Sequence, residues 1–172
     1  MSSSGVIIQG SARSEGNTAR IVGYVSEDLG FEVIDLRKKR IGDFHYDFKN
    51  SDDDFLPLIA EIVAKHATII YATPVYWYSM SGMMKTFFDR ITDLMRVEKE
   101  LGRRLREMNM AMISCGSDPD LPDGFTVPFS ETANYLGMSY LGDVHTWVLN
   151  DRIPQQVAND LDEFIDGIKS QF

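Results

Sequence analysis

The stretch VIIQGSARSEGNT, residues 6–18, decides the fold of this chain. Its opening run, Val6 to Ile8, is entirely apolar and stops at Gly10, which is typical of a short strand buried on both faces. From Asn17 to Leu29 apolar residues recur every three or four positions, which predicts an amphipathic helix, and Gly30 is a suitable residue to end it. The stretch therefore predicts a strand, a polar loop and a helix in direct succession.

The same succession continues along the rest of the chain. Apolar runs predict further strands at residues 31–36, 67–72, 110–113 and 144–149. Helical patterns begin near residues 52–54, after residue 82, near residue 129 and at residue 155, whereas 37–53 predicts a loop and 96–107 a helix extension or a solvated connection. Alternating strands and helices predict an α/β fold with a parallel sheet covered on both faces. Five strands suit a three-layer, flavodoxin-like sandwich of order 2-1-3-4-5, in a single domain over residues 1–172.

The helix expected after Gly82 has a clear apolar stripe. The stripe is formed by Met84, Phe87, Phe88, Ile91 and Met95. The pattern leaves four charged residues on the other faces, namely Lys85, Asp89, Arg90 and Asp93.

The composition restricts the classes of protein. Of the 172 residues, 44 % are hydrophobic and 25 % are charged, which fits a globular protein rather than a disordered one. The formal net charge of -9 disfavours nucleic acid as a partner, because binding to a phosphate backbone needs clustered lysine and arginine. The single cysteine, Cys115, excludes an internal disulfide framework and a CxxC metal site within one chain.

Two further features predict a cytoplasmic protein that does not contact a membrane. Residues Met1 to Gly5 carry no charged region ahead of the first apolar run, so they do not have the pattern of a secretory signal. No apolar stretch approaches the roughly 20 residues that a membrane-spanning helix needs.

Three predicted loops have unusual composition, and the predicted strand order brings them together. In open parallel sheets, ligands bind at the carboxyl ends of the strands, near the point where the strand order reverses. In the order 2-1-3-4-5, the loops after the first, third and fourth strands lie side by side at that point. We therefore expect the functional site in these three loops.

The first loop, residues 10–18, leads directly into a helix, whose unpaired N–H groups favour an anion. Its side chains can add hydrogen bonds and one cation, from Ser11, Arg13, Ser14, Asn17 and Thr18. The loop lacks the Gly-Lys-Ser/Thr of a Walker motif and the spacing GxGxxG, which disfavours a nucleoside triphosphatase and an ordinary NAD-binding fold. We interpret it as a phosphate-binding loop, with a simple capped helix start as the alternative.

The second loop, residues 73–82, contains three adjacent aromatic residues, Tyr76, Trp77 and Tyr78. They cannot all face the core, and a flat heteroaromatic ring offers them a stacking partner worth about 0.5–1.5 kcal/mol per contact beyond buried area. A hydrophobic protein interface is the alternative, and the two interpretations are compatible.

The third loop, residues 114–119, consists mostly of small residues that would let a ligand lie close to the backbone. A turn shaped by glycine and by Asp-Pro is an equally good explanation. Cys115 has no CxxC partner, so we expect a small packed residue rather than a nucleophile.

These segments resemble a known family. SARSEGNT (11–18), TPVYWYSMSG (73–82) and KTFFDR (85–90) are similar to parts of the NAD(P)H-dependent FMN reductases, and the likeness covers most of the chain. The resemblance implies FMN as cofactor, with its phosphate on Ser11, Arg13, Asn17 and Thr18. Its ring would lie against Pro74, Val75, Tyr76, Trp77 and Tyr78, with Ser114, Cys115, Gly116 and Ser117 at the other edge. Ser14 and Ser79 complete the candidate cofactor-binding residues.

The resemblance also implies an activity. A reduced nicotinamide, NADPH or NADH, would pass hydride through bound FMN to a small acceptor by a ping-pong mechanism, the acceptor being a quinone, a nitro- or azo-aromatic, a metal ion or free flavin. No catalytic side chain or metal is then needed, and the scattered His45, His66 and His145 are expected to be structural. Members of the family are often homodimers or homotetramers with the flavin near the subunit interface.

Departures from related families leave alternatives open. One cysteine cannot supply the compact motif of the iron–sulfur flavoproteins, and Arg13 with residues 16–18 favours the reductases over the flavodoxins. A flavodoxin-type electron carrier is the main alternative function, and a regulatory module without flavin is a weaker one. The basic residues Arg96, Lys99, Arg103, Arg104 and Arg106 indicate a solvated face, with a grip on the 2′-phosphate of NADPH as the alternative.

Overall fold

A five-stranded parallel sheet forms the middle layer of the computed structural model, which describes residues 4–172. The strands are β1 (Gly5–Gln9), β2 (Glu32–Asp35), β3 (Thr68–Pro74), β4 (Asn109–Gly116) and β5 (Ser139–Trp147). Their order is β2-β1-β3-β4-β5, which confirms the predicted fold class and strand order. Residues Met1–Ser3, which belong to the segment without the pattern of a secretory signal, lie outside the described residues.

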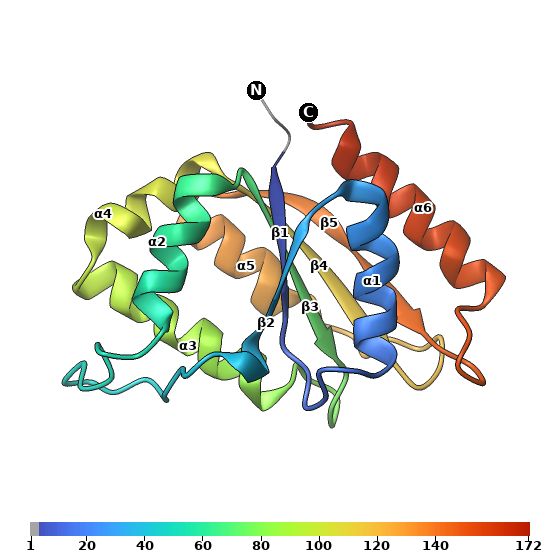
Figure 1. Ribbon diagram of the computed structural model, residues 1–172, viewed down its shortest axis with the longest axis horizontal. Helices are drawn as coiled ribbons and strands as arrows, with labels where there is room; N and C mark the ends of the chain where they lie inside the picture. Colours follow the sequence, from blue (N-terminus) through green and yellow to red (C-terminus); the bar gives the residue numbers. More distant parts are fainter. Residues whose placement is uncertain (1–3) are drawn as a thin grey trace.

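Helices cover both faces of the sheet (Figure 1). One face packs against α1 (Asn17–Leu29) and α6 (Gln155–Lys169). The other face packs against α2 (Phe55–Lys65), α3 (Gly82–Arg96) and α5 (Val127–Leu136). A short helix, α4 (Lys99–Arg104), and two 3-10 turns, η1 (Leu36–Lys38) and η2 (Leu105–Glu107), complete the described chain. Between residues 4 and 172, no helix is long and apolar enough to span a bilayer.

Neighbouring residues of the central strands face opposite layers. In β3, Ile69 and Tyr71 pack with α2, α3 and α5, whereas Ile70 and Ala72 pack with α1 and α6. Because both faces are covered, the central strands are continuous apolar runs in the sequence. Each fully buried isoleucine contributes about 1.5–3 kcal/mol, so the sheet holds the loops at its carboxyl edge in fixed positions.

The last two strands differ from the prediction in their bounds. Strand β4 extends to Gly116, so Ser114, Cys115 and Gly116 belong to the strand rather than to the predicted loop. Strand β5 begins at Ser139, whereas the apolar pattern predicts a start near residue 144. The first half of β5 is a partly exposed sheet edge that contains Gly142 at φ 109°, and these features interrupt the apolar pattern.

Helix α3 buries two charged residues that the sequence pattern places away from its apolar stripe. Arg90 and Asp93 are only 1 % and 3 % exposed. Arg90 Nε donates to Asp93 Oδ2 at 2.8 Å, and the guanidinium also pairs with Asp53, which precedes α2. The prediction for Arg90 and Asp93 is wrong because Asp53 lies 37 residues from Arg90 in sequence, where no local pattern can show the pairing. These three residues are called the Arg90 cluster below.

Candidate functional site

The three predicted loops line one hollow of about 660 Å³ at the carboxyl edge of the sheet. Figure 1 shows the loops after β1, β3 and β4 on the same side of the molecule as the start of α1. A volume of this size falls in the range of small-molecule and cofactor sites. The lining residues are Ser11, Arg13, Glu15, Gly16, Asn17, Thr18, Arg20, Pro74, Val75, Tyr76, Cys115, Gly116, Ser117 and Asp151.

One end of the hollow is built to take an anion. Helix α1 starts after Gly16, which has no side chain to accept from the first N–H groups, and its first turn holds no acidic residue. These groups point to the hollow that Asn17 and Thr18 line, with the positive end of the helix dipole. Arg13 adds a cation that forms no ion pair among the described residues. The set fits a phosphate group.

The loop after β1 is held in place by its neighbours. Ser11 is 6 % exposed, and its Oγ accepts a hydrogen bond from the backbone N–H of Arg13 at 3.3 Å. Gly10 packs so tightly that a Cβ there would lie 2.9 Å from Met84 Cε. Ser81 Oγ donates to the carbonyl of Gly10 at 2.5 Å and so ties the first loop to the start of α3.

The second loop forms a tight hairpin at the rim of the hollow. Tyr76 and Ser79 exchange two backbone hydrogen bonds, of 2.9 and 3.1 Å. Between them, Trp77 and Tyr78 adopt left-handed conformations, with φ of 47° and 65°, and are 93 % and 76 % exposed. A left-handed conformation costs a residue with a side chain about 1–2 kcal/mol, so the hairpin is a strained way to present two large rings to solvent.

The end of β4 is braced by His145 of β5. Ser114 is fully buried, and its Oγ lies 2.8 Å from His145 Nδ1. His145 Nε2 lies 3.0 Å from the carbonyl oxygen of Asp118, which can only accept, so Nε2 carries a proton, and in the neutral imidazole Ser114 donates to Nδ1. A Cβ on Gly116 would lie 2.9 Å from His145 Cε1, so only glycine fits beside this ring. The imidazole therefore shapes the segment that lines the hollow.

Cys115 contributes packing to the hollow and not a thiolate. It is 5 % exposed. Burial raises the pKa of its thiol, and hydrogen bonds with Thr146 and Thr18 lower it by less. A protonated thiol is a poor nucleophile, in agreement with the prediction of a packed residue.

The structure gathers most, but not all, of the predicted site residues around the hollow. The lining includes Ser11, Arg13, Asn17, Thr18, Pro74, Val75, Tyr76, Cys115, Gly116 and Ser117. It does not include Ser14, Trp77, Tyr78, Ser79 or Ser114. The last of these is buried beneath the lining, and the two large aromatic residues stand at the hairpin tip beside it.

Several lining residues are absent from the predicted set. Asp151 comes from the turn after β5, and its Oδ1 pairs with Arg20 Nη1 of α1 at 3.2 Å across the rim. Asn150 and Asp151 both have positive φ, and an Asn-Asp pair is typical of such turns. The sequence therefore indicates a turn at this point, but it does not indicate that the turn lies beside α1.

The basic cluster Arg96, Lys99, Arg103, Arg104 and Arg106 lies at the opposite edge. Helix α4 and η2 immediately precede β4, so they lie at the amino ends of the strands. Arg104 Nη2 donates to the carbonyl of Val63 at 2.6 Å, and Arg103 pairs with Glu100. The cluster therefore does not face the hollow, and the alternative of a grip on NADPH is not supported for these residues.

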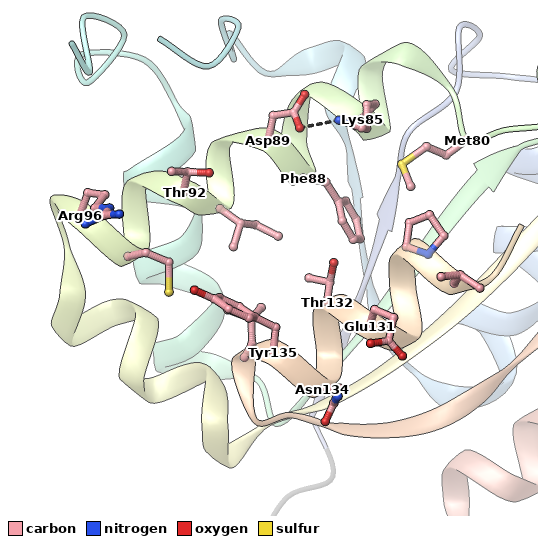
Figure 2. Close-up of a pocket in the computed structure, with 15 residues that line it drawn as sticks. Met80, Lys85, Phe88, Asp89, Thr92, Arg96, Glu131, Thr132, Asn134 and Tyr135 are labelled. Atoms are coloured by element: carbon pink, nitrogen blue, oxygen red, sulfur yellow. Dashed lines mark hydrogen bonds and ion pairs between the residues drawn. The ribbon is translucent and has the colours of Figure 1, made fainter. Parts of the chain in front are cut away.

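A second, larger hollow of about 750 Å³ lies between α3 and α5 (Figure 2). Figure 2 shows Phe88 and Tyr135 facing it, with Lys85 and Asp89 paired on the α3 side at 2.5 Å. Tyr135 is 78 % exposed. The titratable residues that line this hollow are Lys85, Asp89, Arg96, Glu131 and Tyr135. Within residues 4–172, no three or more His, Cys, Asp or Glu side chains gather as a metal site.

The fold and the anion end of the hollow define a flavodoxin-like protein with a nucleotide-type cofactor site. Residues 5–147 match the model of the NADPH-dependent FMN reductase family, and the chain belongs to that family. It is therefore a flavoprotein oxidoreductase that depends on FMN and a reduced nicotinamide.

Relatives and solved structures agree with this assignment. The chain is 29 % identical over 148 residues to YwqN of Bacillus subtilis (strain 168), assigned as an NAD(P)H-dependent FMN-containing oxidoreductase, with 80 % of this chain and 81 % of that protein covered. The Trp repressor binding protein of Bacillus subtilis superimposes with a TM-score of 0.70 at 23 % identity, covering 94 % and 95 % of the two chains. An FMN-dependent NADH-azoreductase of Bacillus anthracis, solved with FMN, gives 0.67 at 12 % identity, covering 98 % and 99 %. The two structures establish the fold alone.

Proposed function

We propose that the chain is a single FMN-binding domain over residues 1–172 that holds FMN in the hollow at the carboxyl edge. The observation that supports this most strongly is the polarity of that hollow. Its α1 end presents free N–H groups and Arg13, and its other end presents Pro74, Val75 and Tyr76. A phosphate at the first end and a flat ring at the second match these two chemistries.

At the phosphate end, we assign the binding groups to Ser11, Arg13, Ser14, Asn17 and Thr18. Arg13 supplies a charge-assisted hydrogen bond, which is about twice as strong as a neutral one. Thr18 is 4 % exposed and Ser11 is 6 % exposed, so their hydroxyls are held in place before the ligand arrives. Preordered donors reduce the entropy lost on binding.

At the ring end, the assigned residues are Pro74, Val75, Tyr76, Trp77, Tyr78, Ser79, Ser114, Cys115, Gly116 and Ser117. The two walls are joined, because the N–H of Val75 donates to the carbonyl of Cys115 at 2.9 Å. Ser114 acts from below, through its hydrogen bond with His145. The exposed Trp77 and Tyr78 are available to contact a second aromatic ring above the flavin.

Bound FMN supplies hydride transfer, so the chain needs no nucleophile or general base of its own. The chain's contribution is to orient the ring and to keep one face of it accessible from the hollow. Because the ring would be reached through this hollow, the nicotinamide donor and the electron acceptor would enter it one after the other. That order of events is a ping-pong mechanism. We propose a quinone, a nitro- or azo-aromatic, a metal ion or free flavin as the acceptor, and the cytoplasm, where reduced nicotinamide is produced, as the location.

The hollow between α3 and α5 is the proposed surface for a second copy of the chain in a homodimer, or in a homotetramer built from it. Arg96 of α3 and Glu131 of α5 line it, and neither forms an ion pair within residues 4–172 (Figure 2). A two-fold axis would pair Arg96 of each copy with Glu131 of the other. Met80 lines the same hollow and directly follows the hairpin of residues 76–79, which is called the aromatic hairpin below. The surface therefore continues to the flavin site. Sedimentation of wild type and of Arg96→Glu tests it, since the charge reversal should shift the protein toward monomer.

A visible spectrum of the purified protein with added FMN, followed by anaerobic titration with NADH and NADPH, tests the proposed function. Bound-flavin absorbance that bleaches rapidly is the expected result. Bound flavin that stays oxidised would favour the flavodoxin-type electron carrier instead. Absence of bound flavin would show that the interpretation of all three loops is wrong.

A further inference from the structure

Four consecutive cations, Arg37-Lys38-Lys39-Arg40, follow strand β2 and are called the basic segment. All four are exposed, on a chain whose net charge is -9. Such a run gives the surface a local positive potential that attracts anions. The site described above does not use the basic segment.

The basic segment lies at the same edge of the sheet as the hollow that the three predicted loops line, which is called the flavin hollow below. Strands β1 and β2 are parallel neighbours, with Gln9 opposite Asp35, so the segments that follow them leave the sheet side by side. Arg37 Nη1 donates to the carbonyl of Ala12 at 2.6 Å, and Ala12 directly precedes Arg13 of the hollow. Figure 1 shows the turn after β2 next to the loop after β1.

A cavity of about 220 Å³ opens beside the basic segment. It is lined by Leu36, Arg37, Lys39, Ile41, Asp43, Met83, Thr86 and Phe87. Apolar side chains from the loop after β2 and from the first turns of α3 form one part, and Arg37 with Lys39 forms the cationic part. Asp43 also lines it, with the Thr86 hydroxyl 3.5 Å from its Oδ1. The cavity thus combines a surface for a flat apolar ring with cations for an anion beside it.

The four cations are not equally free to bind. Arg37 is engaged with Ala12, and Arg40 donates its backbone N–H to Asp54 Oδ2 at 2.6 Å and its Nη2 to the carbonyl of Asp52 at 2.6 Å. Lys38 and Lys39 form no ion pair among the residues that the structure describes. Lys39 lines the cavity, and its charge is one of the causes that lower the pKa of the Glu61 carboxyl, whereas Lys38 stands beside the cavity. The two lysines are the groups available to an anion.

We propose that the basic segment and this cavity bind the 2′-phosphorylated adenosine end of NADPH and so make the enzyme prefer NADPH to NADH. The inference rests on the proposed function, since the nicotinamide end of the same molecule must reach the flavin hollow on the other side of the first loop. Lys39 from the cavity lining and Lys38 beside it contact the 2′-phosphate, and the apolar part of the cavity takes the purine. NADH has a hydroxyl in place of the phosphate and gains nothing from the two lysines.

The test compares wild type with the double variant K38A/K39A in steady-state assays with each nucleotide. The KM for NADPH should rise about tenfold, as expected when a phosphate loses two exposed cationic partners, while the KM for NADH and both kcat values stay within about twofold. The matched control is R103A/R106A, which removes two exposed cations at the opposite edge and should leave all four values unchanged. Equal changes for both nucleotides, or none, would overturn the inference.

A second measurement does not depend on turnover. Adenosine 2′,5′-bisphosphate should compete with NADPH on wild type at least about tenfold more strongly than adenosine 5′-monophosphate, and K38A/K39A should remove that difference. Equal inhibition by the two compounds on wild type would contradict the inference. A wild-type protein whose bound flavin is bleached by NADH but not by NADPH would contradict it as well. If neither nucleotide bleaches bound flavin, the proposed function itself is wrong.

Discussion

The flavin hollow and the Arg90 cluster both gather polar groups, but they do so in opposite ways. In the Arg90 cluster the guanidinium donates to Asp53, to Asp93 and to the carbonyls of Gly42 and Asn50, and it lies 5.0 Å from the ring centroid of Phe55. At the hollow, α1 begins without a side-chain cap and Arg13 forms no ion pair among the described residues, while Trp77 and Tyr78 are strained and exposed on the hairpin beside it.

This difference indicates that the Arg90 cluster stabilises the fold and that the hollow serves ligand binding. The cluster satisfies its charges inside the protein and fixes the long loop 39–54 against α3, so its removal should affect folding. The hollow leaves its donors and rings available, so changes there should affect ligands and leave folding almost intact. Helices α1 and α3 show the same contrast, because Ser81 caps α3 by accepting from the N–H of Met84 at 3.1 Å, whereas Gly16 provides no such acceptor.

The largest effect is expected at Arg90. Arg90→Leu leaves Asp53 and Asp93 buried without their cation, and breaking a buried ion pair in this way costs about 3–5 kcal/mol. Urea unfolding should show that loss, and Arg103→Ala, at an exposed ion pair, should change stability by less than about 1 kcal/mol. A loss at Arg90 no greater than at Arg103 would mean that the cluster does not stabilise the fold.

A change at Arg13 is expected to affect ligand binding and not stability. Arg13→Ala should weaken FMN binding by about 1.5–3 kcal/mol, the range for a hydrogen bond to a charged group, with no change in the free energy of unfolding of the apoprotein. Fluorescence titration of FMN and urea unfolding measure the two quantities. Unchanged FMN affinity would rule out Arg13 as a phosphate ligand.

Acid should weaken the Arg90 cluster through Asp53. Burial raises the pKa of Asp53, but hydrogen bonds from Arg90, Phe55 and Gly42 outweigh it and hold the pKa below its ordinary 3.8. The folded pKa is therefore lower than the unfolded one, so this stabilisation is complete above about pH 3.8 and is lost as the pH falls through the folded value. Unfolding measured from pH 5 downward should show a steeper loss in wild type than in Asp53→Asn, and equal slopes would contradict the assignment.

The aromatic hairpin allows a change with effects of opposite sign. Replacing Trp77 and Tyr78 by Asn-Gly, the pair best suited to two left-handed residues, should stabilise the protein by about 1–2 kcal/mol. The same variant should raise the KM for an aromatic acceptor such as a quinone, because it removes both exposed rings. A higher melting temperature with unchanged acceptor kinetics would show that the hairpin has no part in the reaction.

The smallest effect is expected at His145, through its two hydrogen bonds. His145→Gln can still donate to the carbonyl of Asp118, and His145→Asn can still accept from Ser114. If His145 positions residues 116–118, Gln should retain FMN affinity within about twofold, whereas Asn should lose about two- to tenfold, as for one hydrogen bond. Equal losses in both variants, matched by equal losses in stability, would indicate a purely structural role.

Local patterns in the sequence predict much of this molecule. The bounds of α1 follow from apolar periodicity, because one face of the helix is buried. The order of the strands follows from the alternation of strands and helices and from the number of strands. The composition of three loops indicates the hollow, because the strand order places those loops at one edge.

The remainder depends on contacts between distant segments. The pairing of Arg90 with Asp53, the brace of His145 beneath Gly116, and Asp151 at the rim each join elements that are far apart in sequence. The early start of β5 was also not predictable from apolar periodicity, since an edge strand need not be apolar on both faces. A single sequence carries no local signal for any of these.

A crystal structure of the protein with FMN tests the central claim most directly. The account predicts density for the phosphate at the start of α1, within hydrogen-bond distance of Arg13 and Thr18, and for the ring between Pro74–Tyr76 and Cys115–Ser117. Flavin density in the hollow between α3 and α5, or a phosphate placed away from α1, would contradict it.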